Sequence, residues 1–173
     1  MKSILVLGIG NYILRDEGIG IHVVKELEKN WDSPSYVRVL DGGTGSYPLL
    51  CEIAGYDHVI IIDATLDNNP PGTIRILHPK YAKDYPPLLS AHEFGLKQMI
   101  DMLVMFDKVP EFHLVAVSVS DFKKMGMELS DSVRTKFDEI IVKTKNLVSQ
   151  IAQKEGLDNG ALEIEASIQS NNW

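Results

Sequence analysis

The sequence predicts an α/β domain built on a twisted, mostly parallel sheet of about five strands with helices on both faces. Along its 173 residues, short apolar runs typical of buried strands alternate with segments whose apolar residues recur at helical spacing. The run His58–Asp63 contains four consecutive β-branched residues, which is typical of a strand buried on both faces of a parallel sheet. We assign residues 1–154 to a single domain and expect the acidic tail, residues 155–173, to be loosely ordered.

The strand predictions depend on short apolar runs that end at turn residues. The first run stops at Gly8-Ile9-Gly10-Asn11, which predicts a tight turn. The fourth run follows the turn Pro70-Pro71-Gly72 and is expected at an edge of the sheet. The expected strands are Ser3–Leu7, Tyr36–Leu40, His58–Asp63, Thr73–Leu77 and Phe112–Val119.

The helix predictions depend on apolar spacing and on residues that favour helix starts. A helix is expected from Glu17 to about Lys29, and a short one after Ser46 that ends at Gly55. Ser90-Ala91-His92-Glu93 has the capping-box pattern and is expected to open a further helix. Ser130 is expected to cap one long helix near the end of the domain.

Composition and charge exclude several classes of protein. Hydrophobic residues make up 45% and charged residues 24% of the chain, as in ordinary globular domains. The net charge of -7 argues against nucleic-acid and anionic membrane partners, which basic patches recognise. No apolar run approaches the roughly 20 residues that span a bilayer, and Met1–Leu7 is too short for a signal peptide.

The single cysteine, Cys51, suits a reducing compartment because it cannot form an internal disulfide. We interpret it as a small buried residue on a helix. The sequence therefore predicts a soluble protein of the cytoplasm.

Polar side chains follow several of the predicted strands, and the carboxyl ends of parallel strands meet at one edge of a sheet, where ligands bind. Asp63 ends the third strand, and His92 lies in the first turn of a later helix, where the helix dipole favours its neutral form. The residues expected at this edge are Asn11, Asp16, Glu17, Asp41, Thr44, Asp63 and His92.

Three of these residues form a plausible set of metal ligands. Glu17, Asp63 and His92 would offer two carboxylates and one imidazole to a divalent transition metal. Three protein ligands would leave coordination positions for water or substrate. Each residue also has an ordinary interpretation: a first-turn charge for Glu17, a strand-end acceptor for Asp63 and a capping-region residue for His92.

The turn Gly8-Ile9-Gly10 resembles the start of a dinucleotide-binding fingerprint. The third glycine of that pattern would fall at position 13, which is Ile13. Asp16 and Glu17 would also repel a pyrophosphate at the start of the helix. No nucleotide cofactor is therefore expected.

Four motifs, in order, resemble those of the hydrogenase maturation endopeptidases, and a weaker fifth one follows. The resemblance covers about residues 1–152 and implies a twisted sheet between helices. It also implies that Glu17, Asp63 and His92 contact a metal. The matching segments are Gly8–Gly20, Asp41–Thr44, Asp63–Ala64, Ser90–Leu96 and Gly126–Val133.

The resemblance implies an endopeptidase that removes the C-terminal extension of a nickel-iron hydrogenase large-subunit precursor after nickel insertion. The nickel would be supplied by the substrate. Asp16 and Asp41 are further candidates for a general base or for supporting the ligands, and water could be activated either by a carboxylate or by the metal. The alternative is a nickel-dependent chaperone of the large subunit that cuts nothing. Ser118–Lys124 departs from the pattern of many members, so the sequence leaves open which hydrogenase is processed.

Overall fold

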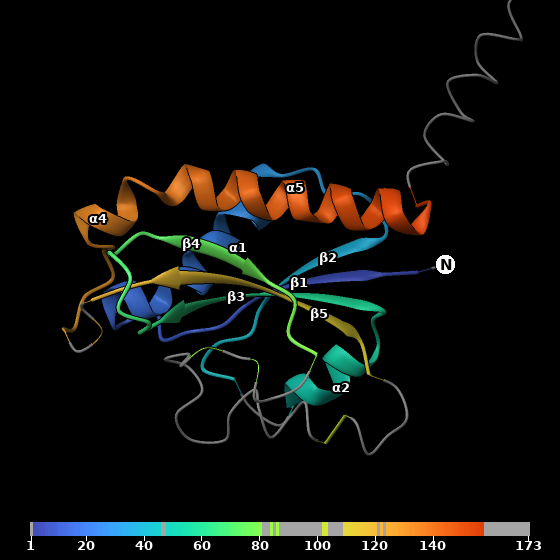
Figure 1. Ribbon diagram of the computed structural model, residues 1–173, viewed down its shortest axis with the longest axis horizontal. Coiled ribbons are helices and arrows are strands. Elements are labelled where there is room, and N and C mark those ends of the chain that lie inside the picture. Colours follow the sequence, from blue (N-terminus) through green and yellow to red (C-terminus); the bar gives the residue numbers. More distant parts are fainter. Residues whose placement is uncertain are drawn as a thin grey trace, which may run out of the picture.

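The computed structural model describes residues 2–45, 48–80, 84, 86, 102–103, 109–120, 122 and 124–157. Five strands form one sheet in the order β2-β1-β3-β5-β4 (Figure 1). All neighbouring strands are parallel except β4, which pairs antiparallel with β5 at the edge. The strands are β1 (Ile4–Gly8), β2 (Val37–Asp41), β3 (His58–Thr65), β4 (Ile74–Leu77) and β5 (Glu111–Ser118). The predicted fold class is confirmed.

The strand register places the carboxyl ends of three strands side by side. Gly8, the last residue of β1, pairs with Asp41 on one side and with Ile62 on the other. Asp63 follows Ile62 directly. We call this edge of the sheet, formed by Gly8, Asp41 and Asp63, the carboxyl rim.

Helices cover both faces of the sheet (Figure 1). Helices α1 (Ile19–Asn30) and α5 (Phe137–Glu155) lie on one face, and α2 (Pro48–Ala54) lies on the other. Successive strand side chains point to opposite faces, so Val6 packs in the core beneath α1 and α5, whereas Leu7 packs in the core beneath α2. All eight residues of β3 are buried, which confirms the prediction of a strand covered on both faces.

Two predicted element boundaries were wrong near the carboxyl rim. Strand β3 does not end at Asp63 but continues to Thr65, because β5 continues beside it and pairs Thr65 with Ser118. The predicted helix from Glu17 begins as a 3-10 helix, η1 (Arg15–Gly18), and becomes α-helical only at Ile19.

The single long helix predicted after Ser130 was also wrong. The structure has a short helix, α4 (Asp131–Arg134), followed by α5 from Phe137. Between them the hydroxyl of Thr135 donates a hydrogen bond to the carbonyl of Ser132 (3.1 Å), a local bond of the kind that competes with helix geometry. Ser130 precedes α4, but its side chain makes no capping bond.

Cys51 is exposed, so its interpretation as a buried residue was wrong. On α2 the buried positions are Leu49 and Ile53, and Cys51 lies halfway between them, on the outer side of the helix. Within the described part of the chain, no helix is long and apolar enough to cross a membrane. Ser46, the helix expected to open at Ser90, and residues 158–173 of the tail lie outside the described residues.

Candidate functional site at the carboxyl rim

Glycines allow the segment that carries Glu17 to lie directly against the ends of β1 and β3. A Cβ atom at Gly10 would lie 2.0 Å from the carbonyl oxygen of Glu17. A Cβ atom at Gly20 would lie 2.2 Å from the carbonyl oxygen of Ile62 and 2.4 Å from that of Ile9. No side chain fits at such distances, so these glycines allow close packing of backbone.

Asp63 lies inside β3, one residue beyond the part that pairs with β1, is paired with Ala116 of β5, and is completely buried. Its Oδ1 accepts a hydrogen bond from the backbone N–H of Ala64 at 2.7 Å. A buried carboxylate is costly unless it is hydrogen-bonded or paired with a cation. The hydrogen bond from Ala64 offsets part of the cost of this burial.

Glu17 reaches the carboxyl rim from η1 and is half-buried. Its backbone N–H donates to the carbonyl of Leu14 (3.1 Å), and its own carbonyl packs on Gly10, two residues beyond the end of β1. Because Ile9 also donates a backbone hydrogen bond to Ile62 (3.0 Å), the backbones that carry Glu17 and Asp63 are joined through the same glycine turn.

Asp16 is completely buried, and both of its carboxylate oxygens accept hydrogen bonds from one residue. Its Oδ1 accepts the backbone N–H of Ser130 at 2.7 Å, and its Oδ2 accepts the hydroxyl of Ser130 at 2.6 Å. These bonds explain why the Ser130 side chain does not cap its own helix. They tie η1 to the start of α4, and thereby hold Glu17 in place.

Asp41 shapes the turn after β2. Its Oδ1 accepts the backbone N–H of Gly43 (2.9 Å), and its Oδ2 lies 3.9 Å from Nζ of Lys25. In the same turn, the N–H of Gly42 donates to the carbonyl of Gly8, and the carbonyl of Gly43 accepts the N–H of Gly10, both at 2.9 Å. Asp41 thus stabilises the loop that is hydrogen-bonded to both Gly8 and Gly10.

His92 lies outside the described residues, so the metal-binding trio stays a prediction. The structure brings the backbone segments of Glu17 and Asp63 together, and hydrogen bonds engage the carboxylates of Asp16 and Asp41. Of the other two candidates, Asn11 makes a local hydrogen bond, in which its Oδ1 accepts the N–H of Ile13 (3.2 Å). Thr44 is exposed.

A groove of about 490 Å³ lies next to the carboxyl rim. Neither Glu17 nor Asp63 is among its lining residues. Burial lowers the pKa of His22 in this groove, and the nearby Lys25 ammonium lowers it further. The lining residues include Tyr12, His22, Lys25, Met127, Leu129 and Phe137.

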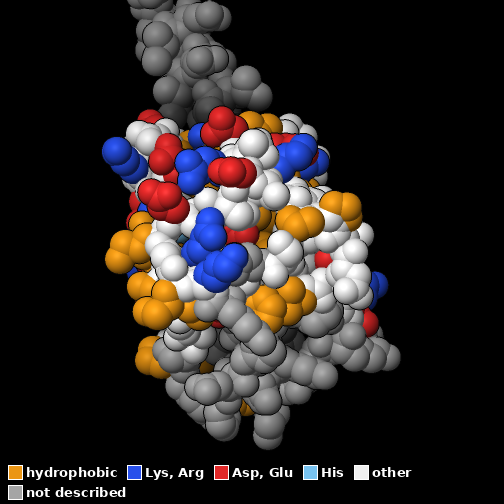
Figure 2. Space-filling model, turned by 90° about the vertical axis from the view of Figure 1, so that its left-hand side faces the viewer, with side chains coloured by type: hydrophobic (Ala, Val, Ile, Leu, Met, Phe, Trp, Pro, Cys, Tyr) orange, Lys and Arg blue, Asp and Glu red, His pale blue; other side chains and the backbone are white. Residues whose placement is uncertain are grey.

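Two loops beside the rim carry exposed apolar side chains. The loops are joined by hydrogen bonds from Arg15 N–H to Gly126 carbonyl (2.8 Å) and from Gly126 N–H to Ile13 carbonyl (2.9 Å). Figure 2 shows this end of the molecule, where hydrophobic side chains lie on both sides of a group of basic ones. The exposed apolar side chains of the two loops are Ile13, Met125 and Met127.

Comparison with known proteins decides which family has this arrangement. The family model of the hydrogenase maturation proteases matches residues 21–146. The chain belongs to this family. The hydrogenase 2 maturation protease of Escherichia coli (strain K12) is 41% identical over 113 residues, which cover 62% of this chain and 67% of that protein.

Solved structures of hydrogenase maturation proteases share the fold. The hydrogenase maturating endopeptidase HybD from E. coli matches with a TM-score of 0.77 and 32% identity, over 89% of this chain and 94% of that one. The [NiFe] hydrogenase maturation protease HybD from Thermococcus kodakarensis matches with a TM-score of 0.69 and 26% identity, over 84% and 98%. The chain is therefore a peptidase of the hydrogenase maturation type, as its motifs predicted.

A second group of possible metal ligands in this protease was not predicted from the sequence. His58, Glu111 and His113 each offer a ligand atom, and these atoms lie within 4.8 Å of one another. They lie at the opposite edge of the sheet from the carboxyl rim. The signal available in the sequence was Glu111-Phe112-His113, because residues i and i+2 of a strand share one face.

Proposed function

We propose that this protease removes the C-terminal extension from the large-subunit precursor of a nickel-iron hydrogenase, and that it recognises the nickel already bound in that precursor. The observation that carries the proposal is that the backbone segments of Glu17 and Asp63, from two separate family motifs, are joined at one rim through a glycine turn. The acidic chain and its single free cysteine suit action in the cytoplasm.

In this proposal the nickel ion is part of the substrate. Glu17, Asp63 and His92 contact it with two carboxylates and one imidazole, a ligand set suited to divalent nickel. The positive ion offsets the cost of the buried Asp63 carboxylate. A precursor without nickel lacks this attraction, which makes cleavage dependent on metal insertion.

Cleavage requires a water molecule to attack the scissile carbonyl carbon and to lose a proton, which passes to the departing amine. A carboxylate of the rim can take that proton as a general base, or the substrate's nickel can polarise the water or the carbonyl. We assign Asp16 and Asp41 to positioning, since hydrogen bonds to Ser130 and Gly43 already engage them.

The loops beside the rim supply a surface for a protein substrate. Ile13, Met125 and Met127 are 46%, 78% and 59% exposed, and clustered exposed apolar side chains mark protein contact sites. The neighbouring groove would receive chain of the precursor that leads to or from the scissile bond.

The test is cleavage of a nickel-loaded precursor, with the same precursor lacking nickel as control. Mass spectrometry should find loss of a C-terminal peptide only from the loaded form. Equal cleavage of both forms would contradict recognition through nickel. A loaded cognate precursor that binds the protein but stays at full length would favour the chaperone instead.

A further inference from the structure

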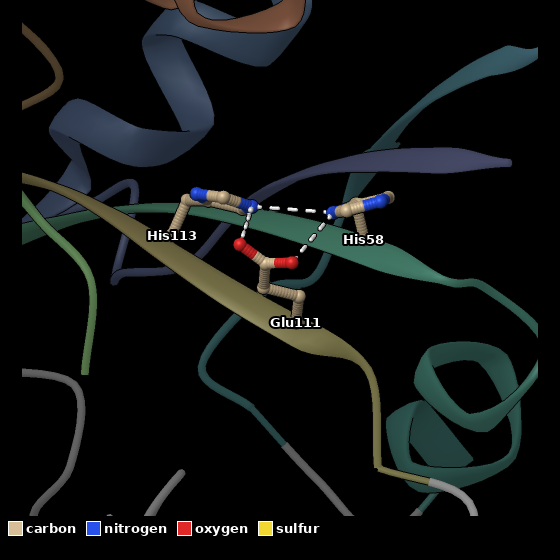
Figure 3. A group of neighbouring side chains, drawn as sticks. All are labelled: His58, Glu111 and His113. Atoms are coloured by element: carbon tan, nitrogen blue, oxygen red, sulfur yellow. Dashed lines mark hydrogen bonds and ion pairs between the residues drawn. The ribbon is translucent and has the colours of Figure 1, made fainter. Parts of the chain in front are cut away.

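Three of the five histidines of the chain, His58, His78 and His113, gather at the edge of the sheet opposite the carboxyl rim. We call this edge, formed by His58 at the start of β3 and by Glu111 and His113 in β5, the amino edge. The register pairs His58 with Glu111 and places His113 two residues further along the same strand. Figure 3 shows both rings and the carboxylate turned toward one another.

The spacing of these groups suits a bound metal ion. Nδ1 of His58 lies 3.4 Å from Nε2 of His113, and the Glu111 carboxylate lies 3.8 Å and 3.9 Å from these two nitrogens. Tetrahedral zinc with Zn–N bonds of about 2.0–2.1 Å holds two nitrogens about 3.3–3.4 Å apart. The imidazoles therefore already stand at the separation that one shared ion requires.

Both imidazoles are held inside the protein, while the third group is open to solvent. His58 is 2% and His113 is 4% exposed, but the Glu111 side chain is 48% exposed. A buried pair of rings fixes the geometry of two ligands, and an exposed carboxylate leaves a route for an ion to enter.

The remaining ring nitrogens have the partners that metal-binding histidines usually have. Nε2 of His58 lies 3.3 Å from a carboxylate oxygen of Glu155, which is itself paired with Lys2. Nδ1 of His113 lies 2.9 Å from Nδ1 of His78. Metal-bound histidines typically donate their other N–H to such an acceptor. If they do so here, the lone pairs of His58 Nδ1 and His113 Nε2 face each other.

We propose that His58, Glu111 and His113 form a second metal site of this protease, which binds Zn²⁺ or a divalent ion of similar chemistry. Two imidazoles and one carboxylate are a ligand set found in zinc proteins. The ion would join β3 to β5 and, through Glu155, would fix the end of α5 against the sheet. This site is independent of the nickel recognition proposed for the carboxyl rim.

A lysine competes with the ion for the carboxylate. Nζ of Lys154 lies 3.1 Å and 3.2 Å from the two oxygens of Glu111, so it supplies the positive charge when no metal is bound. Replacement by an uncharged chain, Lys154→Met, is therefore expected to tighten metal binding several-fold.

The test uses the full chain, stripped of metal and carrying Glu17→Gln and His92→Ala, so that the predicted rim ligands do not contribute. Calorimetric titration with Zn²⁺ alone should give one equivalent, and Co²⁺ should give the visible absorption of a four-coordinate ion. Glu111→Gln should weaken binding by at least about 100-fold, more than loss of an outer partner typically does.

A matched control distinguishes loss of a metal ligand from loss of any surface carboxylate. Glu139 on α5 is also an exposed carboxylate paired with a lysine, Lys136 at 2.9 Å, so Glu139→Gln should leave Zn²⁺ affinity unchanged. Absence of binding, or equal binding after Glu111→Gln, would overturn the site and leave a hydrogen-bonded histidine pair. Precursor cleavage by Glu111→Gln in the otherwise natural chain should stay normal, so failure of this proposal and failure of the proposed function are seen separately.

Discussion

The carboxyl rim and the amino edge are opposite ends of the same sheet, but they assemble polar residues in different ways. At the carboxyl rim, Glu17 comes from η1, and the close packing of Gly10 and Gly20 holds its segment against the backbone of β3 next to Asp63. At the amino edge, His58 and His113 belong to the strands themselves, and strand pairing alone sets their spacing.

The difference indicates that the proposed substrate site and the proposed stabilising ion site are built at opposite ends of one sheet. A loop can change its length and residues without disturbing the sheet, so a substrate site is readily built at strand ends. Ligands inside strands are held rigidly by the ladder of hydrogen bonds, which suits an ion that stabilises the fold.

Removal of one rim ligand should abolish cleavage. Glu17→Gln and His92→Ala should each lower the rate of processing of nickel-loaded precursor by at least about 100-fold, because a lost ligand misplaces the scissile bond. Thermal unfolding should change little, since Glu17 is half-buried at the surface. Glu28→Gln, on the exposed side of α1, is the control and should process normally. Full activity of His92→Ala would remove that residue from the site.

The close packing under the rim should tolerate no side chain. In Gly20→Ala the new methyl would lie 2.2 Å from the carbonyl of Ile62, so unfolding free energy should fall by about 3 kcal/mol or more. Gly43→Ala is the comparison, because a Cβ there meets nothing within 4 Å and only its φ of +55° is unfavourable. That variant should lose about 1–2 kcal/mol. Urea unfolding measures both, and equal losses would contradict the packing argument.

The bond between Asp16 and Ser130 should contribute both stability and activity. Asp16→Asn should lower the unfolding free energy by about 1.5–3 kcal/mol, because charge-assisted hydrogen bonds to a buried carboxylate are lost. Processing should fall as well, since η1 carries Glu17. A double-mutant cycle with Ser130→Ala should show that the two losses are not additive. Additive losses would mean that the two residues act separately.

Acid should destabilise the metal-free protein at the amino edge. The pKa of His113 is lowered from 6.5 to about 4: burial is the largest cause, His78, His58 and Lys154 act in the same direction, and Glu111 opposes them. The unfolded chain therefore binds more protons between pH 6.5 and 4, so stability should fall as the pH falls through this window. One pKa unit corresponds to about 1.4 kcal/mol. Allowing for solvent at the open side, we expect a loss of about 1–2 kcal/mol.

Urea unfolding at pH 7 and pH 4.5 in chelator measures this loss. His113→Gln should show a smaller decrease than the natural chain, since the neutral amide does not titrate. An equal decrease in both proteins would assign the acid sensitivity to other groups. Added Zn²⁺ should stabilise the natural chain at pH 7 by mass action.

Much of the fold could be predicted from local sequence. The run His58–Asp63 predicted a strand covered on both faces, and all eight residues of β3 are buried. Thr73–Leu77 was predicted at an edge, where β4 lies. The ends of elements were predicted less well. Strand β3 runs to Thr65 because β5 pairs with it there, and the local sequence does not show which strand will be its neighbour.

The family could be recognised from the sequence, because its motifs are short and contiguous, and the same motifs predicted which residues reach the carboxyl rim. The contacts that the described rim residues make became visible only in the folded chain. Asp16 accepts both hydrogen bonds of Ser130, which lies 114 residues away along the chain. His58 and His113 are 55 residues apart and meet only because β3 and β5 are neighbours. Local patterns fix backbone preference and chemistry, whereas contacts between distant segments depend on strand order and register, which no local pattern contains.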